Sequence, residues 1–354
     1  MLSLLALWGA VVLLSFSCAL PALSQSGRRQ ENDKSRKPAQ KPVVDPTLPN
    51  SSASPKNQAA PAKKKIDELD SNDVVRISSN LVPIPVSVVD VRGNAVVNLR
   101  LEDFELRVDG QVQTLSDLTR SETTVQMAML FDNSGSLDFA REFEKQAAMR
   151  FFRKVMRQKD EAAIYSIETE SYLALPMTKD IARLEQTIAS FGRPEGGTSL
   201  FDAIIDAATY LRPYSGRRVL VIVSDGIETT SRTSDFEFVM HRVLADDCQI
   251  YVVQTGLYDG ANLRALTAER RMEQLTGQTG GAVYLPKTVQ ELEIAFDQIA
   301  ADLAQQYVLS YYPGVEQRDG RLHLIDLKVK ARNDVRIRSR KGYYAPKPLT
   351  AADL

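Results

Sequence analysis

The chain has 354 residues, of which 44% are hydrophobic and 25% charged, proportions that suit one large globular domain with a small one beside it. The net charge of −1 is uneven: residues 26–65 hold ten Lys or Arg against three Asp or Glu, which leaves residues 66–354 at −8. An acidic globular part argues against nucleic-acid binding. His241 and His323 are the only histidines. So few histidines argue against Ser-His or Cys-His catalysis and against a zinc site.

The N-terminus has the pattern of a signal peptide. Leu2–Leu20 is almost wholly apolar, and Ala22 and Ser24 supply small residues at positions −3 and −1 of a cleavage site. Residues 1–24 are therefore expected to direct export, and the protein is expected to be secreted or to lie in the periplasm or cell envelope. No Lys or Arg precedes the apolar run, which is also long enough to remain as a membrane anchor. Cleavage and retention both stay open, and membrane contact is expected only with retention.

Residues 25–73 are rich in Pro, Lys, Ser, Asn and Gln and lack apolar periodicity. This composition predicts a disordered linker that acts as a solvated spacer.

Residues 74–120 form a β segment. The run Leu81–Val89 is β-rich, and Pro83 and Pro85 within it predict a sheet edge or a bulge. Between two further β-rich runs, Asp109–Gly110 is a strong signal for a two-residue hairpin.

Residues 123–306 alternate between apolar strands and amphipathic helices. Strands are expected at Met127–Phe131, Ala162–Ile167, Tyr172–Leu175, Val219–Val223, Ile250–Val253 and Ala282–Leu285. Helices are expected from apolar stripes at Phe143–Val155, Leu200–Leu211 and Leu292–Leu303, from a capping box at Ser234–Glu237, and before Gly277. Continuous apolar strands alternating with helices predict an α/β fold, a Rossmann-like, doubly wound, mostly parallel sheet covered on both faces. Cys248 opens one of the apolar runs and is expected to be a buried structural thiol.

Residues 307–346 return to β character, and residues 347–354 read as a loose tail. Neither this segment nor residues 74–120 has enough strands to bury a core, because isolated hairpins are marginal in water. Together they offer about seven strands. We predict that they pair into one small β-sandwich-like domain with residues 123–306 inserted in it, and the alternative is two separate β appendages.

Hard oxygen ligands follow two of the expected strands and precede one helix. Asp132, Ser134 and Ser136 follow the first strand of the α/β region, Asp225 follows the strand at Val219–Val223, and Thr198 precedes a helix. In open α/β sheets ligands bind at the carboxyl ends of strands. Two carboxylates and three hydroxyls of low total charge suit Mg²⁺ with water in the remaining positions, and Mn²⁺ is a second possibility.

These five residues resemble the metal-ion-dependent adhesion site of the von Willebrand factor A family, in which Asp-x-Ser-x-Ser is followed by a Thr and an Asp. The resemblance covers about residues 123–306. It implies Mg²⁺ bound by direct and water-mediated oxygens, with one coordination position left for an acidic residue of a partner protein. The runs at 82–90, 101–111, 307–313 and 340–346 resemble the flanking segments of an acidobacterial group of such proteins, which adds little about function.

The sequence therefore favours an extracytoplasmic, metal-dependent protein-binding module of adhesion type, and not an enzyme. The alternatives are a metal-dependent hydrolase of haloacid-dehalogenase type and a structural envelope protein with an idle metal site. The hydrolase usually has a second acid two residues after its nucleophile, where this chain has Ser134. Three nearby acids have plainer interpretations: Asp202 as a helix first-turn residue or a capping partner of Ser199, Asp138 in a helical first turn, and Glu228 as a solvated loop acid.

Overall fold

The computed structural model describes residues 81–120, 123–135, 141–193, 196–232, 235–255, 263–330, 332 and 334–345. The predicted signal peptide, the linker, the C-terminal tail, Ser136 and Asp138 lie outside the described residues. Within the described ranges no helix is both long and apolar enough to cross a membrane.

The α/β region is built on a six-stranded sheet with the order β10-β9-β8-β5-β6-β7. Its strands are β5 (Val125–Asp132), β6 (Glu161–Ile167), β7 (Tyr172–Thr178), β8 (Arg217–Ser224), β9 (Cys248–Gln254) and β10 (Ala282–Tyr284). All neighbours are parallel except β7, which is antiparallel to β6. Every residue of β5 is buried, as a central strand covered on both faces requires.

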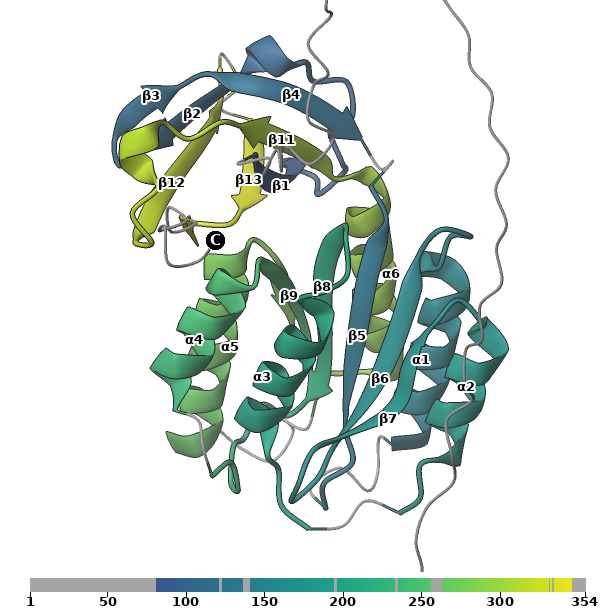
Figure 1. Ribbon diagram of the computed structural model, residues 1–354. Coiled ribbons are helices and arrows are strands. Elements are labelled where there is room, and N and C mark those ends of the chain that lie inside the picture. The colour runs from purple at the N-terminus through teal and green to yellow at the C-terminus, as the bar shows by residue number, and fades with distance from the viewer. Residues whose placement is uncertain are drawn as a thin grey trace, which may run out of the picture. The chain divides into compact units, whose positions relative to one another are not determined.

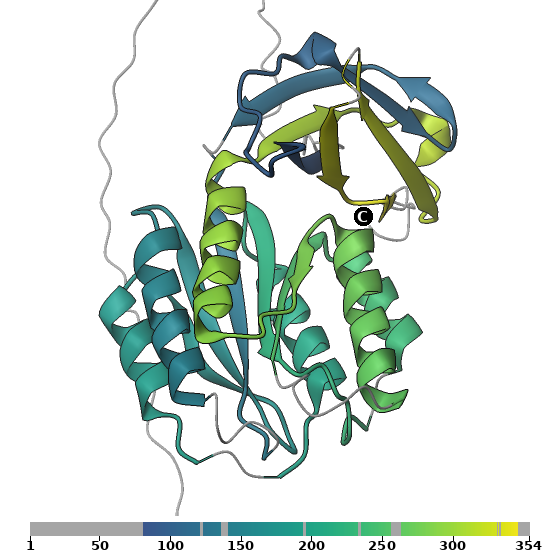
Figure 2. The same cartoon turned by 180° about the vertical axis from the view of Figure 1, so that it is seen from behind.

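Helices cover both faces of this sheet (Figures 1 and 2). They are α1 (Arg141–Val155), α2 (Ile181–Ser190), α3 (Leu200–Leu211), α4 (Phe236–Ala245), α5 (Leu263–Thr279) and α6 (Val289–Gln305). One hydrophobic cluster joins the strands to α1, α2 and α6, and a second joins them to α3, α4 and α5. The predicted α/β fold is confirmed. Cys248 lies buried at the start of β9, as expected.

The helices differ from the sequence prediction in three places. The sequence interpretation missed α2, which begins where the Asp180 carboxylate accepts hydrogen bonds from two backbone N–H groups. The buried stripe of α1 does not include Phe143, which is 46% exposed, because the inward face carries Glu144 instead. The N-cap of α4 is Asp235 and not Ser234, which lies outside the described residues.

The segments before and after the α/β region form two four-stranded sheets, β13-β1-β11-β4 and β14-β12-β2-β3. The first segment supplies β1 (Val82–Asp90), β2 (Phe104–Val108), β3 (Gln111–Gln113) and β4 (Leu115–Arg120), and a 3₁₀ turn at Leu101–Asp103. The second supplies β11 (Tyr307–Tyr311), β12 (Leu322–Val329), β13 (Val335–Ser339) and β14 (Gly342–Tyr344), with a 3₁₀ turn at Val315–Gln317. Each sheet mixes strands of both segments around one shared core, which confirms the predicted small β domain.

Strand β1 is not an edge strand, which corrects the prediction drawn from its two prolines. It pairs with β11 over Val82–Val86 and with β13 over Val86–Asp90. Pro83 and Pro85 therefore lie in the half where β13 provides no neighbour, and their missing N–H groups cost no ladder hydrogen bond there.

The predicted hairpin between β2 and β3 is confirmed. Its two turn residues, Asp109 and Gly110, both have positive φ, as a type I′ turn requires. The Asp109 carboxylate also bonds to the ring of His323 on β12 at 2.7 Å, and Asp319 lies 3.1 Å from the other ring nitrogen.

Polar contacts join the β domain to the α/β region. Asp302 on α6 accepts hydrogen bonds from Tyr251 at 3.1 Å and from Arg338 of β13 at 2.7 Å. Gln306, which separates α6 from β11, donates to Ser87 on β1 at 3.1 Å.

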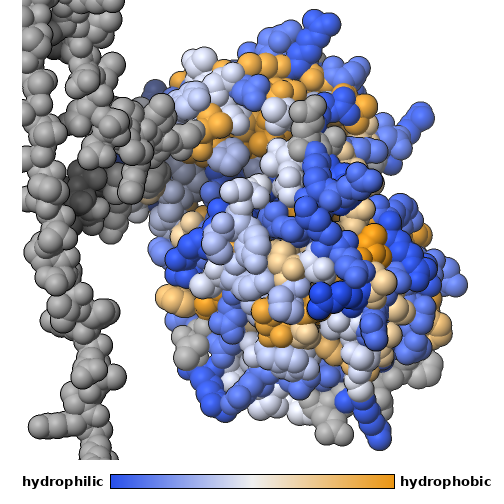
Figure 3. Space-filling model, turned by 45° about the vertical axis from the view of Figure 1, so that its right-hand side comes forward, coloured by the Kyte–Doolittle hydropathy of each residue, from blue (hydrophilic) through white to orange (hydrophobic). Residues whose placement is uncertain are grey.

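The surface turned to the viewer in Figure 3 is mostly hydrophilic, with hydrophobic residues in small groups between polar ones.

Candidate metal centre

The two predicted acidic ligands lie at the carboxyl ends of neighbouring strands. Asp132 is the last residue of β5, and Asp225 directly follows Ser224, the last residue of β8. Since β5 and β8 are parallel and in direct register, their ends meet at one edge of the sheet. In Figure 1 these ends point away from the two sheets of the β domain.

Hydrogen bonds from Ser134 and Ser224 hold the carboxylate of Asp132, which is 1% exposed. Its Oδ1 accepts from the backbone N–H of Ser134 at 2.9 Å, and its Oδ2 accepts from the hydroxyl of Ser224 at 2.5 Å. Ser224 accepts in turn from the N–H of Gly226 at 3.0 Å. Ser224 therefore links the two acidic loops, a role that the sequence interpretation missed because it depends on which strands are neighbours.

Asp225 is 5% exposed and is held by its own loop and by β9. Its Oδ1 accepts from the N–H of Ile227 at 2.8 Å, and its carbonyl accepts from the Gln254 amide at 2.9 Å. One carboxylate oxygen is thus committed to shaping the turn after β8.

Thr198 is brought to the same edge by the loop before α3. Its N–H donates to the hydroxyl of Thr229 at 2.7 Å, and its carbonyl accepts from the N–H groups of Thr229 and Thr230 at 3.0 and 3.2 Å. The N–H of Gly135 donates to the carbonyl of Gly196 at 3.4 Å. These bonds join the three loops that carry the predicted ligands, and Thr198 is itself 4% exposed.

Ser134 is 2% exposed and lies in the turn after β5, beside Asp132. The structure thus places Asp132, Ser134, Thr198 and Asp225 on three adjoining loops, whereas Ser136 lies outside the described residues.

Two charged residues of α1 belong to the surroundings of the site and were missed from the sequence. The guanidinium of Arg141 donates to the carbonyl of Asp132 and to the side-chain oxygen of Asn133, and it lies 4.8 Å from the centre of the Phe131 ring. Glu144 is 1% exposed, and its carboxyl group lies beside the Thr255 hydroxyl and the Arg141 guanidinium. A carboxylate that is almost fully buried is costly, so it calls for an explanation.

The acids influence one another's protonation. Burial raises the pKa of Asp132, hydrogen bonds from Ser134 and Ser224 oppose this, and the charge of Asp225 adds to the rise. Burial raises the pKa of Glu144 to about 7, a hydrogen bond from Thr255 and the Arg141 charge oppose this, and the charges of Asp132 and Asp225 raise it further. The three carboxyl groups therefore share one poorly solvated region.

The charges of this region do not balance. Arg141 binds neutral oxygens of the loop and forms no ion pair with Asp132. Fully ionised, Asp132, Asp225 and Glu144 exceed the single guanidinium by two negative charges. A divalent cation would neutralise that excess, and carboxylate and hydroxyl oxygens are donors that Mg²⁺ accepts. The residues present therefore fit the ion.

The site is not built from acids, histidines and cysteines alone. Over the described ranges, no group of three or more His, Cys, Asp or Glu side chains is arranged to hold a metal ion. The predicted set contains only two such residues, Asp132 and Asp225, and depends on hydroxyl ligands for the rest.

Two nearby acids make hydrogen bonds that the sequence did not reveal. Glu228 is a half-buried loop acid whose oxygens accept from the N–H groups of Phe201, Thr230 and Ser231 and from the Ser231 hydroxyl at 2.7–2.9 Å. It thereby caps the start of α3 from a distant loop, while Ser199 makes no side-chain cap. Asp202 lies in the first turn of α3, one of the two predicted alternatives, and accepts from the N–H of Arg232 at 3.1 Å.

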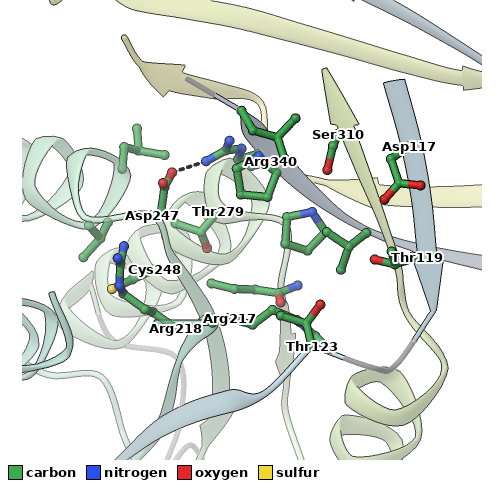
Figure 4. Close-up of a pocket in the computed structure, with 18 residues that line it drawn as sticks. Asp117, Thr119, Thr123, Arg217, Arg218, Asp247, Cys248, Thr279, Ser310 and Arg340 are labelled. Atoms are coloured by element: carbon green, nitrogen blue, oxygen red, sulfur yellow. Dashed lines mark hydrogen bonds and ion pairs between the residues drawn. The ribbon is translucent and has the colours of Figure 1, made fainter. Parts of the chain in front are cut away.

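A separate cavity of about 390 Å³ lies at the amino ends of β8 and β9, against the outer face of the sheet that contains β1 (Figure 4). Arg217 and Arg218 line it from β8, and Asp117 and Ser310 from the β domain. Because it is at the opposite ends of the strands from Asp132, it does not belong to the candidate metal site.

The chain resembles several proteins of known structure. An aerotolerance-related membrane protein from Bacteroides fragilis is 19% identical, with 50% of this chain and 98% of that chain covered and a TM-score of 0.40. The PilB minor pilin from Streptococcus sanguinis is 10% identical, with 52% and 62% covered and a TM-score of 0.42. The pilus adhesin SpaC from Lactobacillus rhamnosus GG is 9% identical, with 69% and 48% covered and a TM-score of 0.44. No protein with a curated description shows significant similarity to the chain.

The sheet order and the helices on both faces define a Rossmann-like α/β domain, a class of fold in which ligands bind at the carboxyl ends of the strands. Residues 127–228 match the von Willebrand factor type A domain. The match includes Asp132, Thr198 and Asp225. The resemblance to the acidobacterial group stays a prediction.

Proposed function

We propose that this protein is a metal-dependent protein-binding module that acts outside the cytoplasm. Asp132, Ser134, Ser136, Thr198 and Asp225 would hold one Mg²⁺ ion, with Mn²⁺ as a substitute. The bound cation would supply an open coordination position that accepts a carboxylate from a partner protein. No covalent chemistry is needed for this role.

The excess negative charge beside the loops is the observation that carries the proposal. Asp132 and Asp225 are buried on adjoining loops, and their charges raise the pKa of Glu144, which is itself buried. Burying like charges without a counter-charge is unfavourable. A divalent cation resolves this cost, whereas a role in helix capping alone would not require the second acid.

The chain's own residues prepare the site before any metal binds. Ser224 orients the Asp132 carboxylate, and Thr229 holds the Thr198 loop against the Asp225 loop. The β domain lies at the opposite ends of the strands, where it leaves the metal face accessible to a partner. Export through residues 1–24, with residues 25–73 as a spacer, would present that face outside the cytoplasm.

Calorimetric titration with Mg²⁺ and Mn²⁺ tests the metal site. We expect Asp132→Asn and Asp225→Asn to lower the affinity at least tenfold, because each removes one of the two charged ligands. Asp235→Asn is the matched control, since asparagine caps a helix as well as aspartate does, and it should bind like the wild type. Unchanged affinity in Asp132→Asn would refute the assignment.

A pull-down of extracytoplasmic proteins with and without EDTA separates a binding module from an idle metal site. A partner that is retained in Mg²⁺, lost in EDTA and lost with Asp132→Asn supports the module. Metal binding without any EDTA-sensitive partner favours the structural role.

N-terminal sequencing of the mature protein tests export: a soluble cytoplasmic chain that still begins at Met1 would contradict it.

A further inference from the structure

A second cavity, of about 420 Å³, opens beside the candidate metal site. Its walls are the loop after β8 and the first turns of α5, and it is lined by Gly226, Ile227, Glu228, Thr229, Leu263, Arg264, Thr267, Ala268 and Arg271. We call it the Arg271 cavity. Gly226 directly follows Asp225, and the N–H of Ile227 donates to the Asp225 carboxylate. The cavity and the metal site therefore share one loop.

Arg271 is held in this cavity by two aromatic rings. Its guanidinium carbon lies 5.4 Å from the centre of the Phe201 ring and 5.7 Å from that of Phe236. Both rings are buried, at 4% and 8% exposure, so the platform is rigid. Arg271 forms no ion pair or hydrogen bond with any described residue. Since no hydrogen bond within the described ranges uses them, the N–H donors of the Arg271 guanidinium can bind a planar acceptor.

The acid in the cavity does not neutralise Arg271. Glu228 lines the cavity, but its two oxygens already accept four hydrogen bonds at the start of α3 and in its own loop. It forms no ion pair within 4 Å with an arginine of the described residues. Its negative charge is thus stabilised by N–H and O–H donors.

Arg264 adds a second positive charge at the cavity. It is exposed and lies in the first turn of α5, where no acidic residue accompanies it. Helix N-termini favour negative side chains, so an arginine there gives up a small amount of helix stability. Together with Arg271 it gives the cavity a positive balance next to a site where a partner carboxylate is expected.

We propose that the Arg271 cavity is a second carboxylate-binding site, and that the partner segment carries two acidic side chains. One would occupy the open position of the metal, and the other would pair with the edge of Arg271, with Arg264 close by. We test spacings of two and three residues along an extended segment, which cover about 7 to 10 Å. This inference rests on the proposed function and specifies the chemistry of its partner.

Blocked glycine peptides test the proposal on the full chain. The one-acid probe contains Asp-Gly-Gln, and the two-acid probes contain Asp-Gly-Glu and Asp-Gly-Gly-Glu. Affinities are measured by NMR titration in saturating Mg²⁺ and again in EDTA. We expect the better two-acid probe to bind about fivefold more tightly than the one-acid probe, as one partly exposed charge-assisted pair allows.

Three variants identify the residue responsible. Arg271→Gln should bring the ratio of the two affinities to about one, and Arg271→Lys, which keeps the charge without the planar fork, should leave an intermediate ratio. Arg270→Gln is the matched control, because Arg270 is exposed on α5 outside the cavity, and its ratio should equal that of the wild type. Thermal unfolding and Mg²⁺ titration of each variant check that the fold and the metal loops are intact.

The outcomes separate the two proposals. A wild-type ratio of one, or a ratio unchanged in both Arg271→Gln and Arg271→Lys, overturns the Arg271 cavity while EDTA-sensitive binding of the one-acid probe keeps the metal site. If binding of every probe ignores EDTA but the two-acid preference still disappears in Arg271→Gln, the metal proposal fails and the carboxylate site stands.

Discussion

Replacing Glu144 by Gln should change how the stability of the metal-free protein depends on pH. Burial and the charges of the neighbouring Asp132 and Asp225 raise the pKa of Glu144 from 4.5 to about 7, in spite of Arg141. In the unfolded chain this carboxyl releases its proton at much lower pH. The folded state holds a proton that the unfolded state has lost, so the stability contribution of Glu144 is fully present below pH 4.5 and falls as the pH rises to 7.

The size of the effect follows from the separation of the two pKa values. A difference of about 2.5 units at 1.36 kcal/mol each corresponds to about 3 kcal/mol in total, of which about 2.5 kcal/mol is lost between pH 5 and pH 8. Glu144→Gln keeps the shape of the side chain but cannot ionise. Relative to the wild type it should therefore gain about 2.5 kcal/mol of unfolding free energy over this interval.

Urea denaturation in EDTA, followed by far-ultraviolet circular dichroism at pH 5 and pH 8, measures this difference. The control is Glu142→Gln, which removes a carboxylate from an exposed position of the same helix turn. Its free energy of unfolding should follow the wild type at both pH values. If Glu144→Gln also follows the wild type, the reasoning about the buried acid is wrong. Saturating Mg²⁺ should shrink the difference, because a bound cation offsets the charges that raise the pKa of Glu144.

Three further results are expected. Gly281→Ala should lower the free energy of unfolding in denaturant by at least about 3 kcal/mol, because its Cβ would lie 1.8 Å from the carbonyl oxygen of Ile250. Gly277→Ala should raise it by about 0.5–1 kcal/mol, because this position is helical and no atom lies within 4 Å of the added Cβ. Burial lowers the pKa of His323, but its two carboxylate partners raise it by more. The stability that His323 contributes is therefore present below pH 6.5 and lost as the pH rises through the raised pKa. In thermal scans the Tm of His323→Gln should depend less on pH than that of the wild type, and an equal dependence would contradict this. The fragment 74–306 should lose hydrogen-exchange protection in β1 and β4, since it lacks their partner β11; full protection there would show that the β segments do not depend on each other.

The sequence by itself determined the α/β fold and the location of the candidate ligands along the chain. Short apolar runs such as Met127–Phe131, alternating with longer amphipathic stretches, are typical of strands buried on both faces, and this information is local to the sequence. The positions of Asp132 and Asp225 directly after two such strands implied that they meet, because parallel strands end at one edge. The scarcity of strands in each flanking segment likewise implied that the two segments combine.

The tertiary structure decided which residues surround the site. Glu144 and Arg141 belong to a charged stretch of α1 that the sequence alone would place at the surface. Both are buried because of how α1 packs against the sheet. Glu228 caps α3 from a loop 27 residues further along the chain, a pairing that no local pattern encodes. Charge balance, hydrogen-bond satisfaction and the platform under Arg271 all depend on contacts between distant segments, whereas periodicity and turn chemistry depend on neighbours in the chain. The physical reason is that a local pattern determines what an element is, and only the packing of elements determines what its side chains meet.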